Sequence, residues 1–147
     1  MRCDIISGVR LVVDTDVVVA AMRSPTGASA ELLRRIDRGG AVMLLTVALA
    51  LEYEAVCMLA EHRLASGLNA AEVGIYVDGL IGMAEPVKAF FRWRPQLRDP
   101  GDELVLEAAV NGQADAIVTF NVSHLREARN FGVEVMRPGI ALRRIRK

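Results

Sequence analysis

The chain alternates short apolar runs with longer segments of helical periodicity. The first run, within 9–14, is apolar from Leu11 to Val13 and ends at Asp14, which is typical of a central strand in a parallel sheet. The predicted strands are 9–14, 41–45, 116–119 and 133–136, with an ambiguous short strand at 85–91, and the predicted helices are 28–38, 47–64, 70–82, 102–110 and 123–130. This alternation predicts an α/β fold in which helices cover both faces of a parallel sheet.

Turn and capping residues separate these predicted elements. Thr46 and Asn69 stand directly before helical segments, where their side-chain oxygens can cap the first turn. The segments 24–27 and 94–101 combine proline and glycine and are predicted loops. We expect one domain spanning 1–147, with a core at about 9–136 and a basic C-terminal tail at 137–147.

The composition predicts an excess of apolar surface. Apolar residues make up 52% of the 147 residues and the mean hydropathy is +0.29, although aromatic residues make up just 5%. No apolar run reaches the ~18 residues that a membrane span requires. We therefore expect the excess apolar surface to cover a subunit interface rather than to meet lipid.

The net charge of zero gives the chain as a whole no signature of polyanion binding. The tail differs, because it is basic and holds no acid. Its basic residues are Arg137, Arg143, Arg144, Arg146 and Lys147. Arginine suits phosphate and carboxylate partners, so the tail either contacts nucleic acid or is a solvated segment.

The two cysteines, Cys3 and Cys57, fit neither a disulfide framework nor a zinc site. Cys57 lies in an apolar helical segment and is expected in the core. The first residues lack the basic and apolar regions of a signal peptide, so a reducing cytoplasm is the expected compartment.

Two acids, Asp14 and Asp16, follow the first predicted strand. Reacting groups of parallel α/β sheets lie just beyond the carboxyl ends of the strands, and carboxylates there are natural ligands for Mg²⁺ or Mn²⁺. A buried carboxylate without a partner is costly, which favours a functional role for Asp14 over that of a capping residue. Asp16 either supports such a site or begins a loop.

Glu52 tests this hypothesis from within a predicted helix. Its neighbours three and four residues away are all apolar, whereas Glu54 lines up with Glu61 on a stripe that can reach water. Glu52 therefore lacks a helical partner on its own face. This lack of a partner predicts that Glu52 binds a cation. The structural alternative is a salt bridge to a distant arginine.

Further polar residues follow the later elements. Asp102 precedes the helix 102–110, either as its N-cap or as a third acid of the site, whereas Asp99 before Pro100 is expected in a turn. Asn121 and His124 follow the strand 116–119, which brings them near Asp14 if the two strands are neighbours.

Taken together, five segments resemble the PIN-domain family. They lie at 12–16, 24–27, 51–54, 99–102 and 114–121, and read Val-Val-Asp-Thr-Asp, Ser-Pro-Thr-Gly, Leu-Glu-Tyr-Glu, Asp-Pro-Gly-Asp and Ala-Asp-Ala-Ile-Val-Thr-Phe-Asn. The resemblance covers about 9–136 and is closest to the VapC-like toxins of prokaryotic type II toxin–antitoxin pairs.

The resemblance implies a three-layer α/β/α sandwich around a parallel sheet, usually a homodimer, that cleaves RNA with Mg²⁺ or Mn²⁺ and is neutralised by a cognate antitoxin. The metal-binding acids of the family fall on Asp14, Glu52 and Asp102. A further acid usually follows the late strand, where this chain has Asn121 and His124. Asn121 is counted with the catalytic residues on this basis, and Asp16 replaces the usual asparagine, which partly restores the missing charge.

Two alternatives stay open. The first is a weak or inactive member of the same family that binds RNA or protein, which the residues at 121 and 124 favour. The second is a haloacid-dehalogenase-type phosphatase, because Asp14 and Asp16 resemble the paired acids of that family. Such a phosphatase also needs a lysine and a later acidic pair, and Lys88, the one lysine before the tail, lacks such a setting. For RNA backbone contacts, Arg92, Arg94, Arg98 and the tail are candidates.

Overall fold

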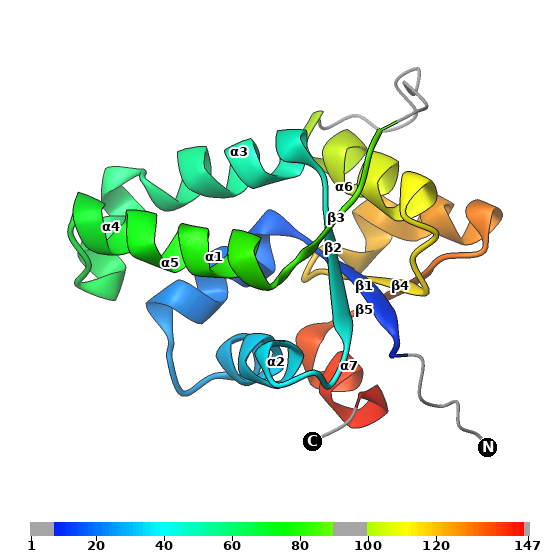
Figure 1. The fold of residues 1–147 in the computed structure, drawn as a ribbon, viewed down its shortest axis with the longest axis horizontal. Helices are drawn as coiled ribbons and strands as arrows, with labels where there is room; N and C mark the ends of the chain where they lie inside the picture. Colours follow the sequence, from blue (N-terminus) through cyan, green and yellow to red (C-terminus); the bar gives the residue numbers. More distant parts are fainter. Residues whose placement is uncertain (1–7, 90–99, 146–147) are drawn as a thin grey trace.

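The computed structural model describes residues 8–89 and 100–145, which form a five-stranded sheet with helices on both faces (Figure 1). The strands are β1 (Arg10–Val13), β2 (Val42–Leu45), β3 (Glu85–Pro86), β4 (Ala116–Val118) and β5 (Glu134–Met136). The helices are α1 (Thr15–Arg23), α2 (Ala28–Asp37), α3 (Val47–Cys57), α4 (Ala60–Ser66), α5 (Ala70–Met83), α6 (Pro100–Asn111) and α7 (Pro138–Arg144), together with the 3₁₀ helix η1 (Val122–Phe131).

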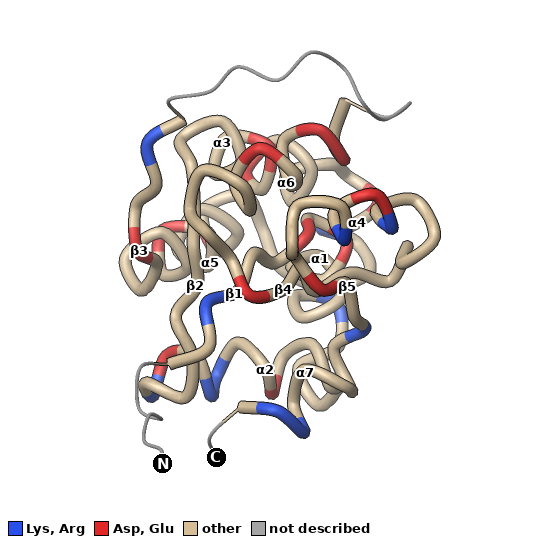
Figure 2. The backbone as a smooth tube through the Cα atoms, turned by 90° about the vertical axis from the view of Figure 1, so that its right-hand side faces the viewer, with Lys and Arg blue, Asp and Glu red and all other residues tan. Residues whose placement is uncertain are grey.

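The sheet has the order β3-β2-β1-β4-β5, and each neighbouring pair is parallel. Helices α3 and α6 lie on one side of the sheet and α2 and α7 on the other (Figures 1 and 2). The three-layer α/β/α sandwich expected from the sequence is thus confirmed. The central strands are buried on both faces, with Leu11, Val12 and Ile117 each at most 1% exposed. Burying an aliphatic side chain of this size contributes about 1.5–3 kcal/mol, which makes these strands the core of the fold.

Helix α1 is absent from the elements predicted above. Its residues Val17, Val18 and Val19 are β-branched and favour strands by intrinsic propensity. All three are nevertheless buried, because α1 packs against α2 and α3. The Asp14 side chain caps this helix by accepting a hydrogen bond from the backbone N–H of Thr15. Tertiary packing and the cap therefore override local propensity here.

The single helix expected over 47–64 is two helices, because the chain turns at Leu59, whose ψ of 138° is extended. The two predicted caps are confirmed: the Thr46 Oγ1 accepts from the Leu49 N–H, and Asn69 forms a reciprocal capping box with Glu72. The helix expected to open at Asp102 begins at Pro100 instead. Asp102 is therefore in the first turn of α6 and is not its N-cap.

Residues assigned above to a C-terminal tail form helix α7, which packs against α2. Pro138 and Ala141 are buried, and the Arg35 Nη1 donates to the Leu142 carbonyl oxygen at 3.2 Å. At least up to Ile145, the basic segment is thus a docked helix rather than a solvated extension.

Cys57 is buried as expected, and its burial raises the pKa of the thiol to about 11. Several residues singled out from the sequence lie outside the described residues, namely Cys3, Arg92, Arg94, Arg98, Asp99, Arg146 and Lys147. Among the described residues, no helix combines the length and apolar character needed to cross a membrane.

Candidate active site

The candidate site lies at the carboxyl ends of β1 and β4, which are neighbours in the sheet. Val13 pairs with Val118, so Asp14 and Thr119 are the first residues beyond the two strands. The Asp14 N–H donates to the Val118 carbonyl oxygen at 2.9 Å and extends the pairing by one step. The prediction that the residues after these two strands meet is therefore confirmed.

Asp14 is fixed by two short hydrogen bonds. Its Oδ1 accepts from the Thr15 N–H at 2.7 Å, and its Oδ2 accepts from the Thr119 hydroxyl at 2.7 Å. The residue is 7% exposed. These two hydrogen bonds orient the buried carboxylate, as supporting hydrogen bonds orient the carboxylate ligands of metal ions.

Asp16 is the second acid of the pair. Its Oδ2 accepts from the Phe120 N–H at 3.0 Å and from the Asn121 Nδ2 at 3.3 Å. Its Oδ1 is buried and has no hydrogen-bond donor among the described residues. Burial, followed by the charge of Asp14, raises the pKa of this carboxyl from about 3.8 to about 6. The pair thus brings two carboxyl groups together at this edge, and one oxygen of Asp16 has no donor among the described residues.

The first turn of η1 connects this pair to Asp102. Asn121, which begins the turn, contacts Asp16 through its side chain and Thr119 Oγ1 through its backbone N–H at 3.0 Å. Three residues later, the His124 Nδ1 lies 3.8 Å from the Asp102 Oδ2. Asp102 is buried in the first turn of α6, where the helix dipole favours a negative charge.

A family model described as PIN domain matches residues 10–123, which include every residue of this cluster except His124. The chain belongs to the PIN domain family. Searches of curated proteins and of solved structures give no significant match. PIN domains are generally metal-dependent nucleases, so the family match favours nuclease chemistry over the phosphatase alternative.

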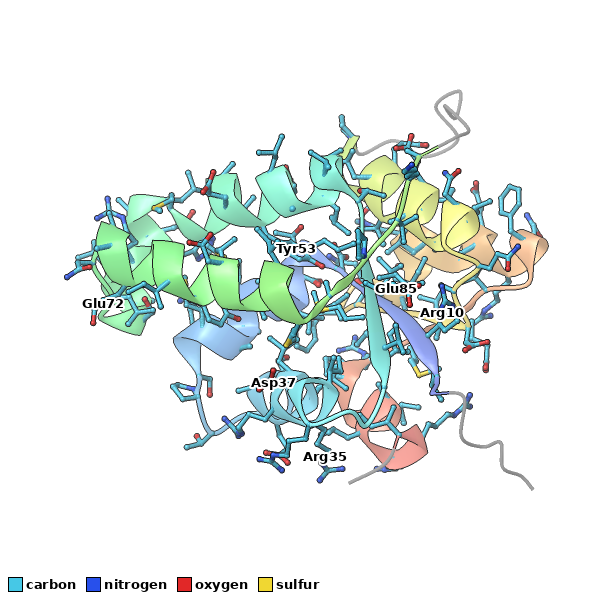
Figure 3. All side chains as sticks on the ribbon, in the orientation of Figure 1. Arg10, Arg35, Asp37, Tyr53, Glu72 and Glu85 are labelled. Carbon is cyan, nitrogen blue, oxygen red and sulfur yellow. The ribbon has the colours of Figure 1, made fainter. Side chains whose placement is uncertain are left out.

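Glu52, the remaining acid singled out from the sequence, is half-buried on α3 of this PIN domain. It forms no hydrogen bond or ion pair with another described residue, so no described arginine satisfies it. The next residue of the helix, Tyr53, is fully buried on the inner side of α3 (Figure 3). Its hydroxyl group donates a hydrogen bond to the Val13 carbonyl oxygen. Burial, and next the charge of Asp14, raises the pKa of this phenol. Tyr53 thereby fixes α3, and Glu52 with it, to the end of β1.

No three His, Cys, Asp or Glu side chains of the described residues are gathered closely enough to form a metal-binding group. The ligand set Asp14, Glu52 and Asp102 therefore stays a prediction. The donor chemistry of the site nevertheless fits a hard divalent cation, because all its acids are carboxylates and the buried Asp16 Oδ1 lacks a donor.

Two residues that shape this site were not predicted for that role. Thr119 was expected as the end of a strand, yet its hydroxyl also holds the Asp14 carboxylate and lies 3.5 Å from the Asp16 Oδ2. Tyr53 was noted as part of a motif, without its hydrogen bond to the strand end. A polar side chain directly after a buried strand signals a position at the edge of the sheet, although it does not indicate which acceptor the Thr119 hydroxyl bonds.

Proposed function

We propose that this protein is a metal-dependent endoribonuclease. The observation that carries the proposal is the pair of buried Asp14 and half-buried Asp16 at the carboxyl edge of the sheet, in which the Asp16 Oδ1 has no donor among the described residues. Two carboxylates this close together are stabilised by a divalent cation, and nucleases of the PIN domain family generally use one.

The proposed metal ligands are Asp14, Glu52 and Asp102, with Asp16 adding charge next to Asp14. When bound there, Mg²⁺ or Mn²⁺ lowers the pKa of a coordinated water and screens the phosphate that the water attacks. Mg²⁺ and Mn²⁺ are the proposed ions because both prefer carboxylate and water oxygens.

The remaining residues of the site keep these acids in place. Thr119 and the Thr15 N–H orient Asp14, while the Phe120 N–H and Asn121 orient Asp16. Asn121 occupies a position where relatives usually carry an acid, so its amide is proposed to position Asp16 or a phosphate oxygen instead of supplying charge. His124, exposed beside Asp102, is in reach of the same edge.

The test is cleavage of a single-stranded RNA by the purified protein with added Mn²⁺. We expect Asp14→Asn and Asp102→Asn to abolish cleavage, because each removes a carboxylate from the proposed ligand set. Asp78→Asn, at an exposed position on α5, is the matched control and retains activity. Equal cleavage by the wild type and both site variants points to a contaminating nuclease and refutes the proposal.

We further propose that the nuclease is the toxin of a toxin–antitoxin pair, acts in the cytoplasm and forms a homodimer. Large apolar side chains are exposed on α3 and α5, among them Val47 at 78%, Leu51 at 60% and Ile75 at 72%, and they support an interface. Induced expression is expected to arrest growth, and Asp14→Asn is expected to relieve the arrest. A monomeric mass by light scattering contradicts the dimer, and equal arrest by both proteins contradicts the toxin role.

A second candidate is a PIN domain that binds RNA or protein without cutting RNA. Asn121 favours it, because an amide stands where an acid is usual and donates to Asp16. Titration with Mn²⁺ separates the two functions. The nuclease is expected to show saturable binding in the millimolar range or tighter, lost in Asp14→Asn, whereas a binding module shows none.

A further inference from the structure

The described arginines are spread unevenly over the helices: α1, α4 and η1 carry some, α3, α5 and α6 carry none, and the largest group lies on or next to α2 and α7. Helices α5 and α6 carry acids and neither lysine nor arginine. On the side of the sheet opposite α6, α2, α7 and the residues next to them carry a set of arginines that we call the arginine face (Figure 2). The arginine face consists of Arg34, Arg35, Arg38, Arg137, Arg143 and Arg144. Its helices contain two acids, Glu31 and Asp37, so the layer is net positive although the chain is neutral.

The docking of α7 makes these arginines one surface. Helix α7 packs directly against α2, and Arg35 bonds to the Leu142 carbonyl oxygen. Arginines that lie about a hundred residues apart in the sequence therefore share one side of the molecule. Like charges so arranged repel one another, which disfavours the arrangement unless an anion joins it.

The described acids neutralise part of the arginine face. Glu31 accepts from both Arg34 Nε and Arg35 Nε at 3.0 Å, so one carboxylate serves two guanidinium groups. Arg144 is paired with Glu134 at 2.9 Å. The other three arginines of the arginine face are Arg38, Arg137 and Arg143. All three are exposed, and none of their side chains forms a hydrogen bond or ion pair with another described residue. Free, exposed guanidinium groups are the forks that bind phosphate oxygens in pairs.

The arginine face is continuous with the candidate active site. The Thr119 N–H, next to the acids, donates to the Met136 carbonyl oxygen at 2.9 Å, and Arg137 is the residue that follows. Helix α7 then leads away from this edge for seven residues, or about 10 Å at 1.5 Å per residue. Arg137 thus follows β5 at the same carboxyl edge of the sheet as the acids, and Arg143 lies about one helix length farther on.

We propose that the arginine face binds the phosphate backbone of an RNA strand whose neighbouring segment occupies the acid site. The identity of this strand as substrate rests on the proposed function. The arginine face attracts the backbone, whereas α5 and α6 carry acids and neither lysine nor arginine, so the RNA is expected to leave the site across the arginine face. Contacts of this kind fix position and carry no base specificity.

The experiment measures binding of a fluorescent single-stranded RNA of ~30 nucleotides in EDTA over a range of KCl concentrations. EDTA prevents cleavage, so binding is read separately from catalysis. Each phosphate contact to a single strand contributes about 0.7 to the slope of log Kobs against log salt concentration, so Arg38→Ala with Arg143→Ala is expected to reduce the slope by ~1.4. The matched control, Arg23→Ala with Lys88→Ala, removes two exposed cations outside the arginine face and leaves the slope unchanged.

An unchanged slope in the Arg38 and Arg143 variant, or no RNA binding by the wild type, overturns the proposal. So does stronger binding to phosphatidylserine vesicles than to RNA when it depends on the same two arginines, because the surface then serves a membrane. The proposed nuclease can fail on its own: RNA binding with the expected slopes but no cleavage in Mn²⁺ leaves the arginine face as an RNA-binding surface and refutes the catalytic function.

Discussion

Replacing Asp16 by asparagine tests whether the negative charge of Asp16, next to Asp14, lowers the stability of the folded protein. The raised pKa of Asp16, about 6 against an ordinary value near 3.8, means that folding disfavours its charged form. As the pH rises through this interval, the unfolded chain loses the proton first, so the free energy of unfolding falls and levels off above about pH 6. Asp16→Asn removes this cost and keeps a side-chain oxygen that can accept from the Phe120 N–H.

The size of the effect follows from the same pKa. A difference of about two pH units corresponds to about 3 kcal/mol, and because Asp16 is partly exposed, solvent screening reduces this to about 1–2 kcal/mol. For a domain of this size, that gain raises Tm by about 3–6 °C. Thermal unfolding in EDTA at about pH 7.5 measures it, and Asp78→Asn on the exposed side of α5 is the control.

The gain in stability from Asp16→Asn depends on pH. At about pH 4 the folded wild type already carries a protonated Asp16, so the two proteins are expected to differ little. A Tm of Asp16→Asn that equals or falls below that of the wild type at about pH 7.5 refutes the charge argument. A gain of the same size at both pH values refutes it as well, because a packing effect has no such titration.

Three further substitutions test the fold around the site. Tyr53→Phe removes the hydrogen bond to Val13 and leaves a buried carbonyl without its donor. It is therefore expected to lower the free energy of unfolding, measured by urea denaturation, by about 1–3 kcal/mol. An unchanged denaturation midpoint contradicts this role of Tyr53. Thr46→Ala removes the cap of α3 and is expected to cost about 1 kcal/mol in the same assay, with exposed Thr26→Ala as a neutral control. Gly112→Ala places a methyl group 2.9 Å from both the Ala108 carbonyl oxygen and a Leu44 methyl, so we expect a loss of about 1–3 kcal/mol, whereas Gly79→Ala on open surface of α5 is expected to stabilise. Equal effects of the two glycine substitutions contradict the packing argument.

Strand positions and caps could be predicted because their causes are local. A wholly apolar run such as Leu11–Val13 fits a buried parallel strand, and Thr46 or Asn69 before a helical segment caps it wherever it packs. Helix α1 could not be predicted in this way. Its valines favour a strand locally, and it is a helix because its neighbours bury them. The docking of α7 on α2 likewise depends on contacts between distant segments.

The candidate site was predictable to a similar extent. Parallel strands place their carboxyl ends at one edge, which was enough to bring Asp14, Asp16 and Asn121 together. The part played by Thr119 was not predictable from its residue type, since a threonine is common at the end of a strand and its hydroxyl has many possible acceptors. The position of Glu52 depends on how α3 packs, which Tyr53 controls from the buried side of the helix.

The hydrogen bond between Thr119 and Asp14 spans 105 residues of sequence. During synthesis, the first acid leaves the ribosome long before the strand that supports it exists, and long-range parallel pairing is slow to form. A nascent or truncated chain that stops before β4 therefore has no assembled acid pair. Under the proposed ribonuclease function, this order of assembly means that the unfinished chain does not cut the message and the ribosome that are producing it.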